Sequence, residues 1–188
     1  LEKKKEITFI NYFGEQRFGQ NNIKIGLAIM KGDLEKACKL IDDPKINGYL
    51  GERPKDYVGA LRELPKRRLT MYIHSVQSHI WNILAEKFRD HEMIPIPGYI
   101  VEYPCEEMRD FVEKYLAEYG LISRDFIIRK IPNLFTGGGE REREVCASKM
   151  NVMDKGRDDL NEGKKKIVIS FELPKGSYAT VFVKSLFE

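Results

Sequence analysis

A short stretch near the start of the chain combines residue types that recognise nucleic acids. Residues Asn11 to Gly19 spell Asn-Tyr-Phe-Gly-Glu-Gln-Arg-Phe-Gly, with three aromatic rings, two glycines and one arginine. Aromatic rings stack on nucleobases, guanidinium groups pair with phosphates, and glycines let a backbone approach a ligand closely. The alternative interpretation is a core strand that ends in a turn, with the three rings buried.

A basic cluster supplies a second candidate contact surface for nucleic acid. Lys66, Arg67 and Arg68 precede a long helical pattern predicted for residues 69–91, whose apolar stripe leaves His74 and Gln77 on the polar side. Cationic side chains in such a position can meet phosphates. A run of surface charge is also what any solvated helix face carries, so the cluster alone does not decide between the two.

Composition limits the class of protein. The chain has 188 residues with a net charge of +3, 42% hydrophobic and 32% charged residues, which is typical of a soluble globular protein. Its three cysteines (Cys38, Cys105 and Cys146) form no Cys-x-x-Cys pair, so we expect neither a disulfide framework nor a metal site, and a cytoplasmic location. No apolar run is long enough to cross a bilayer, and many lysines and glutamates favour a thermophilic source.

Hydrophobic periodicity and turn residues predict the elements that position these side chains. We expect a strand over residues 6–13 and a helix over 23–41 that breaks at Gly32-Asp33. A connecting loop over 42–55, helices over 56–64 and 106–119, and a short helix from Ser123 should follow. Residues 137–143 suggest a mobile loop and 167–173 a strand. Residues 177–186 suggest a helix, with a strand over 178–183 as the alternative.

Three stretches together resemble one family. Asn11 to Gly19 is similar to the Asn-x-Phe-Gly-x-Gln-Arg-Phe-Gly motif of the TruD-type tRNA pseudouridine synthases. The segment from Lys66 to Ser78, followed by Trp81-Asn82, resembles the basic helix of these enzymes. Leu173-Pro174-Lys175-Gly176-Ser177-Tyr178-Ala179-Thr180 resembles their Leu-Pro-x-Gly-Ser-aromatic-Ala-Thr motif, and all three occur in the order that the family has.

The resemblance implies an α/β fold of the α+β kind. Its catalytic domain would have a bent, mostly antiparallel sheet with helices, here over residues 1–45 and 148–188, interrupted by a TruD-specific insertion domain over 46–147. The implied activity is isomerisation of uridine 13 of tRNA to pseudouridine, by flipping the base and attack of an aspartate, with tRNA as partner and no cofactor or metal.

The resemblance also assigns roles to particular residues. Phe13 would stack on the flipped base, Asn11 would make a polar contact beside it, and Tyr178 would face the target nucleoside. The RNA contacts would be Arg17, Lys66, Arg67, Arg68, His74 and Gln77. Three other interpretations stay open at this point: Arg17 as a buried strut, His74 as a surface histidine without a function, and Trp81 with Tyr72 as core.

The motif that carries the family's nucleophilic aspartate is not found at its usual place, before the first motif stretch. It belongs to a Gly-x-Lys-Asp-x-x-Ala-x-Thr-x-Gln motif that precedes the Asn-x-Phe-Gly stretch, and here ten residues precede Asn11. Lys55-Asp56 looks superficially similar, but it follows the first motif and lacks the Thr-x-Gln tail, so Asp56 is excluded.

We therefore expect no catalytic residue in this chain, and we expect the nucleophilic aspartate upstream of Leu1. The chain would then be a C-terminal portion that an N-terminal segment completes. A non-catalytic RNA-binding protein and a homodimer paired through an incomplete sheet are the alternatives.

Overall fold

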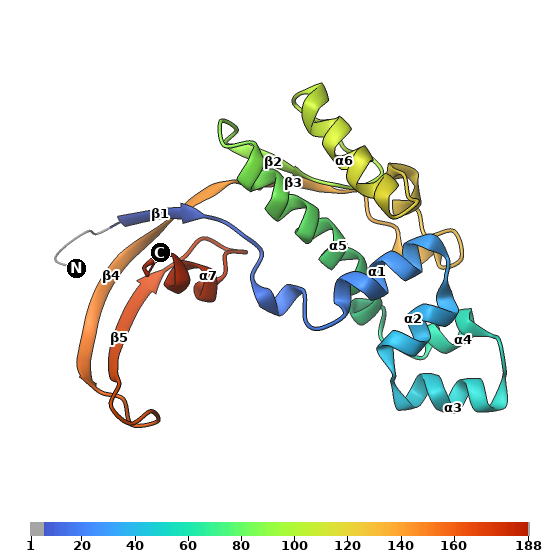
Figure 1. The fold of residues 1–188 in the computed structure, drawn as a ribbon, viewed down its shortest axis with the longest axis horizontal. Helices are drawn as coiled ribbons and strands as arrows, with labels where there is room; N and C mark the ends of the chain where they lie inside the picture. Colours follow the sequence, from blue (N-terminus) through green and yellow to red (C-terminus); the bar gives the residue numbers. More distant parts are fainter. Residues whose placement is uncertain (1–5, 188) are drawn as a thin grey trace. The chain divides into compact units, whose positions relative to one another are not determined.

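The computed structural model describes residues 6–187, which form two compact units. Leu1, upstream of which the nucleophilic aspartate is expected, lies outside the described residues. Unit 1 comprises residues 6–12 and 142–187, and unit 2 comprises residues 13–141 (Figure 1). These boundaries differ from the domain limits expected after residues 45 and 147. Residues 13–45 fall in unit 2 because the helix α1 (Asn22–Lys31) packs along α5 (Lys66–Lys87).

Unit 1 is built on a three-stranded antiparallel sheet. Its strands lie in the order β1 (Glu6–Ile10), β4 (Glu144–Arg157) and β5 (Lys165–Glu172). The sequence predicted β1 and β5, whereas β4 was missed. Among the described residues, β4 pairs with β5 alone beyond Ser148. Its side chains there are mostly exposed and polar, so the apolar alternation that marks a strand is weak.

The helix α7 (Ala179–Ser185) provides the core of unit 1. Its Phe182 is fully buried, with its ring centroid 5.1 Å from that of Phe9 on β1 and 4.7 Å from that of Phe171 on β5. Val145 and Ala147 of β4 complete the buried cluster. The helical prediction for this segment is confirmed, although the helix starts at Ala179 and the Tyr178 carbonyl accepts the first hydrogen bonds.

The long helix α5 is the centre of unit 2. Its predicted apolar stripe is buried, and so are Trp81 and Tyr72, which confirms that these two belong to the core. The close packing of α1 depends on Gly26, because a Cβ atom there would lie 2.2 Å from the Tyr72 carbonyl oxygen. The predicted break at Gly32-Asp33 is confirmed, since α1 ends at Lys31 and α2 covers Leu34–Ile41.

The prediction of a loop over residues 42–55 is wrong, because these residues contain the helix α3 (Pro44–Glu52). Asp43 caps this helix by accepting a hydrogen bond from the Lys45 backbone, and Pro44 occupies the first helical position, which proline tolerates. The next helix, α4 (Tyr57–Arg62), lies within the range predicted for it.

The rest of unit 2 contains the helix α6 (Glu106–Glu118) and a two-stranded sheet of β2 (Met93–Ile96) and β3 (Gly139–Glu142). Strand β3 replaces the mobile loop predicted for residues 137–143, so that prediction is wrong. Three short 3-10 helices complete the unit: η1 (Glu15–Arg17), η2 (Ser123–Phe126) and η3 (Pro132–Leu134). Helices with antiparallel strands confirm the α+β class. Between residues 6 and 187, no helix has the length and apolar character needed to cross a membrane.

Candidate functional site

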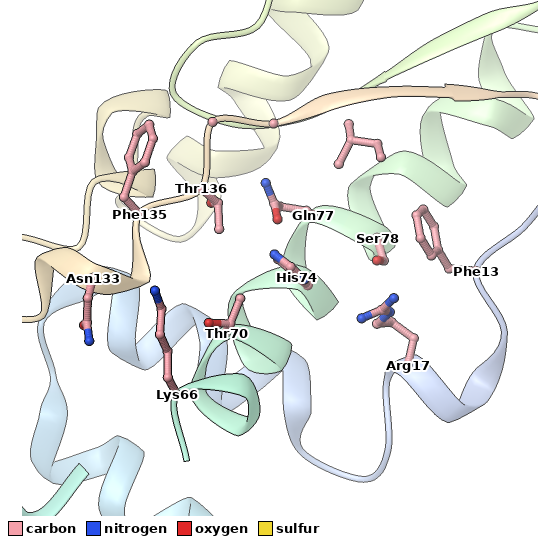
Figure 2. A pocket seen from close by; sticks show the side chains of 13 residues that line it. Phe13, Arg17, Lys66, Thr70, His74, Gln77, Ser78, Asn133, Phe135 and Thr136 are labelled. Carbon is pink, nitrogen blue, oxygen red and sulfur yellow. The ribbon is translucent and has the colours of Figure 1, made fainter. Parts of the chain in front are cut away.

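A cavity of about 440 Å³ in unit 2 brings together residues of the first two motif stretches. Phe13 and Arg17 come from the first stretch, and one face of α5 forms the floor with Lys66, Thr70, His74, Gln77 and Ser78. Figure 2 shows Phe13 and Arg17 on one side of the cavity, Lys66, Asn133 and Phe135 on the other, and His74 and Gln77 between them. Five of the nine predicted site residues therefore share one cavity.

The backbone of Phe13 is held by a side chain of α5. The Asn82 side-chain oxygen accepts from the Phe13 backbone N–H at 2.9 Å, and the Asn82 amide nitrogen donates to the Phe13 carbonyl at 3.0 Å. One amide thus satisfies both polar groups of the Phe13 backbone, as a neighbouring strand would do. The position of the Phe13 ring is therefore set by α5.

The ring of Phe13 belongs to an aromatic and cationic stack. It meets the buried Trp81 ring edge to face, with centroids 5.4 Å apart and an interplanar angle of 89°. The Arg141 guanidinium lies 4.2 Å from the Phe13 centroid and 5.4 Å from that of Trp81. Arg141 was not predicted as a site residue, because its stretch looked like a loop of alternating charge. Cation–π contacts of this kind help to fix the position of the Phe13 ring, which lines the cavity.

Replacing Asn82 tests whether this clamp stabilises the fold. Asn82→Ala leaves two half-buried backbone groups without their partner, so we expect a loss of about 1–3 kcal/mol in the free energy of unfolding. Asn82→Asp keeps the acceptor for the Phe13 N–H but cannot donate to the carbonyl, so it should also destabilise. Urea denaturation provides the measurement. Asn47→Ala is the matched control, because Asn47 bonds to the exposed Asp42 side chain, and an equal loss in both alanine variants would contradict the clamp.

Arg17 has a donor that faces no acceptor. Its guanidinium carbon lies 5.7 Å from the Phe13 centroid, and its Nε is buried without a hydrogen-bond partner within residues 6–187. A buried charged donor without an acceptor is costly, and an anion in the cavity would relieve that cost. Arg17 is therefore partly a packed residue, as the strut interpretation has it, and partly a cationic group of the cavity wall.

Burial favours the neutral form of His74. Desolvation, and in second place the positive charge of Arg17, hold the pKa of His74 below its usual range. Desolvation also lowers the pKa of His79, which packs between the rings of Phe18 and Tyr115. His74 lines the cavity rather than the outer surface, so a contact to RNA would take place inside the cavity.

The lowered pKa values of His74 and His79 predict a dependence of stability on pH. The unfolded chain binds protons to these groups more readily than the folded chain, so stability should be highest above the ordinary pKa of 6.5 and fall as the pH drops below it. His74→Gln removes one of the two titrating groups and should flatten the curve between about pH 7 and pH 5. Thermal melts across this range provide the measurement, and an unchanged slope in the variant would contradict the prediction.

Gln77 does not lie on an exposed polar face, and that part of the prediction is wrong. Its side chain is 4% exposed, and its amide nitrogen donates to the Pro97 carbonyl at 2.6 Å. This bond ties α5 to the segment after β2. Gln77 still lines the cavity, where it contributes to the floor rather than to a rim.

The three basic residues at the start of α5 have different environments. Lys66 is exposed and lines the cavity, whereas Arg67 is exposed and is not among the lining residues. Arg68 pairs with Asp43, the N-cap of α3, and its Nε donates to the Tyr72 hydroxyl at 3.1 Å. Arg68 thereby links α5 to α3, which the sequence did not suggest.

Asn11 and Tyr178 belong to unit 1, and their roles stay predictions. Asn11 is 5% exposed, and its side-chain amide donates to the Glu142 carbonyl at 3.2 Å. Its backbone N–H donates to the Arg143 carbonyl, so Asn11 fixes the chain just after β1. Tyr178 is half-buried at the start of α7.

No carboxylate lines the cavity among the described residues, and these residues contain no group of three or more side chains suited to a metal ion. Asp56 has a structural role instead. Its carboxylate accepts from the Gly59 backbone at 2.9 Å and from the Tyr49 hydroxyl at 2.8 Å. The Gly59 N–H, followed by the Tyr49 hydroxyl, holds the pKa of Asp56 below its usual range. An ionised cap of α4 fits its exclusion as the nucleophile, and an aspartate upstream of Leu1 stays a prediction.

Relatives of the chain carry pseudouridine synthase names. A probable tRNA pseudouridine synthase D of Methanosarcina mazei is 25% identical, with 93% of this chain and 59% of that protein covered. The tRNA pseudouridine synthase D of Leptospira interrogans is 26% identical, covering 99% and 64%. The human pseudouridylate synthase 7 homolog is 31% identical over 52% of the chain. The chain thus spans about three fifths of the length of the first two relatives.

A solved structure has the same fold. A crystal structure of a TruD protein from Methanosarcina mazei covers 93% of this chain with a TM-score of 0.72 at 24% identity, and the chain covers 60% of that structure. The model of the family tRNA pseudouridine synthase D (TruD) matches residues 83–186, more than half of the chain and including the third motif stretch. The cavity unites the two motif stretches that lie outside this match. On this evidence the chain belongs to the tRNA pseudouridine synthase D (TruD) family.

Proposed function

We propose that this chain is the tRNA-binding part of an isomerase that converts uridine 13 of tRNA to pseudouridine. The nucleophilic aspartate would be supplied by polypeptide outside these 188 residues. The proposal is supported by membership of the family and by the names of the relatives, of which the chain spans about three fifths. In this proposal unit 1 contributes to the catalytic domain, and most of unit 2 corresponds to the insertion domain.

The observation that carries the proposal is the convergence of two motif stretches on one cavity. Phe13 and Arg17 lie far before Lys66 and His74 in the chain, yet all four line the same space. The cavity joins an aromatic ring to cationic groups and has no lining carboxylate among the described residues, which suits a nucleotide with its phosphate. A base drawn out of folded tRNA loses stacking worth a few kcal/mol, and the Phe13 ring would offset part of this cost.

Asn11, Tyr178 and Arg67 complete the proposed substrate contacts. Asn11 would make a polar contact to the target nucleoside and Tyr178 would face it, while Arg67 would meet a phosphate from its exposed position. The isomerisation breaks the bond between C1′ of the ribose and N1 of uracil and forms a bond from C1′ to C5. It consumes no cofactor, so positioning and the aspartate would carry the chemistry.

Reconstitution tests the proposal. The N-terminal segment of a TruD relative is supplied in cis or as a separate chain, and nucleosides from a digested tRNA transcript are separated by chromatography. We expect pseudouridine at position 13 only when both parts are present. A transcript in which uridine 13 is replaced by cytidine is the control, and no product with both parts present would overturn the proposed enzymatic activity.

The cavity without a lining carboxylate among the described residues also favours a second candidate, a chain that binds tRNA without modifying it. This candidate predicts binding that weakens with salt, because counterions are released from the few phosphates that meet cationic side chains. It also predicts no turnover when the N-terminal segment is added. The same reconstitution separates the two candidates.

A further inference from the structure

Large apolar side chains are exposed beside the cavity, on the side opposite Phe13. Phe135 is 45% exposed and Tyr99 is 44% exposed, and their rings meet edge to face with centroids 6.2 Å apart. Ile100, next to Tyr99, is 72% exposed. A contiguous group of exposed apolar side chains often marks a binding surface, whereas single exposed apolar residues are common on any protein.

The two loops that carry these rings are fixed to each other. The backbone N–H of Tyr99 donates to the Thr136 carbonyl at 3.3 Å, and that of Ile100 donates to the Gly137 carbonyl at 3.0 Å. The contact is so close that a Cβ atom on Gly98 would lie 2.3 Å from the Gly138 nitrogen. Since the loops are pinned in this way, the rings form a prearranged platform that loses little freedom on binding.

Polar side chains lie next to the platform, and one of them has no hydrogen-bond partner among the described residues. Thr136 is 7% exposed and lines the cavity, and its hydroxyl has no hydrogen-bond partner in the described part of the chain. Asn133 and Lys66 lie on the same side of the cavity as Phe135 (Figure 2). A buried hydroxyl without a partner is a cost that a ligand with a donor or acceptor would remove.

The floor of the cavity is too long for a single nucleotide to contact both Phe13 and Phe135. It is lined from Lys66 to Ser78 along α5, and residues 66 and 78 of an α-helix lie about 18 Å apart along the axis. Phe13 and Phe135 lie on opposite sides of this floor (Figure 2). Cationic groups lie on both sides, with Arg17 on the side of Phe13 and Lys66 on the side of Phe135. A phosphodiester-linked pair of nucleotides therefore matches the charge.

We propose that the Phe135 subsite, formed by Phe135, Tyr99, Thr136, Asn133 and Lys66, binds the base of an unpaired nucleotide adjacent to the target uridine. The base stacks on Phe135, with Tyr99 supporting that ring from its edge. Thr136 and Asn133 hydrogen-bond to the edge of the base, and Lys66 meets its phosphate. The subsite rests on the proposed function, since it takes the neighbour of the nucleotide to be modified.

A double-mutant cycle between protein and RNA tests the subsite. The 188-residue chain is titrated with tRNA transcripts that are intact or carry an abasic nucleotide directly 5′ or 3′ of uridine 13, and binding is followed by fluorescence anisotropy. We expect Phe135→Ala to weaken binding of the intact transcript about tenfold, which corresponds to one lost stacked base. It should cause no further loss with one of the two abasic transcripts, because the base that stacks on Phe135 is already absent there. Phe135→Trp should retain the affinity.

Ile122→Ala is the matched control, because Ile122 is an exposed apolar residue of unit 2 that does not line the cavity. It should leave all affinities unchanged. The subsite would be overturned if the loss of affinity from Phe135→Ala added to the loss from the abasic nucleotide with both abasic transcripts. An unchanged affinity in Phe135→Ala would overturn it as well. Pseudouridine formation by the reconstituted wild type is measured separately. If product forms but the losses of affinity from Phe135→Ala and from the abasic nucleotide are additive, only the subsite is rejected. If those losses are coupled but no product forms, only the proposed enzymatic activity is rejected.

Discussion

Replacing Gly26 by alanine should destabilise the chain by about 3 kcal/mol, the upper part of the range for overpacking in a core. The new Cβ atom would lie 2.2 Å from the Tyr72 carbonyl oxygen and 2.7 Å from a methyl carbon of Val76. The first of these is a backbone atom of α5, so α1 and α5 have to separate before the methyl group fits. Urea denaturation measures the loss in the free energy of unfolding.

Gly48→Ala is the matched control for this prediction. It makes the same change in the helix α3, where a Cβ atom would meet nothing within 4 Å. Since glycine is a poor helix former, this variant should stabilise the chain by about 0.5–1 kcal/mol. Equal effects at both positions would show that α1 and α5 are not in close backbone contact.

Replacing Phe13 by alanine should lower kcat/KM for pseudouridine formation by the reconstituted enzyme about 10- to 100-fold. The range follows from the worth of one base stacked on an aromatic ring, about 1–3 kcal/mol. Phe13→Leu keeps an apolar side chain against Trp81 but offers no aromatic face, so it should lose nearly as much rate while unfolding at nearly the wild-type temperature. Single-turnover assays on a tRNA transcript provide the measurement.

Phe18→Ala is the control in the same motif. The Phe18 ring meets His79 edge to face at 6.1 Å and is not among the cavity-lining residues. This variant should lose stability without a comparable loss of kcat/KM below its melting temperature. If Phe13→Leu retained the wild-type rate, Phe13 would act through packing against Trp81 and Arg141 and not through stacking on a base.

The sequence predicted those helices and strands whose own residues show the full hydrophobic periodicity. The stripe of α5, the break after α1 and the alternation of β5 are of this kind, because the residues that are buried recur with the period of the helix or strand. The helix α3 was missed although Asp43-Pro44 is a good helix start. Gly48 and Gly51 suggested a loop, but both are exposed on this helix, where a glycine costs about 1 kcal/mol at most.

Strand β3 and the first part of β4 could not be predicted in the same way, because their partners β2 and β1 lie far away in the sequence. Glu6 pairs with Ser148, at the other end of the chain, and nothing near residues 139–157 encodes that pairing. The candidate site shows the same division. The motif stretches pointed to Phe13, Arg17 and Lys66. Non-local packing, by contrast, brings Thr136 to the cavity wall and Arg141 to the Phe13 ring.

The aromatic stack beside Phe13 gives the protein a built-in spectroscopic probe. Trp81 is the only tryptophan of the chain, it is fully buried, and its indole N–H donates to the Ile94 carbonyl at 3.0 Å. Its emission therefore comes from a single, rigid and dry environment beside the guanidinium of Arg141. Any ligand that displaces Arg141 or tilts the Phe13 ring changes the fluorescence of one identified residue. Occupancy of the cavity can thus be followed in unlabelled protein.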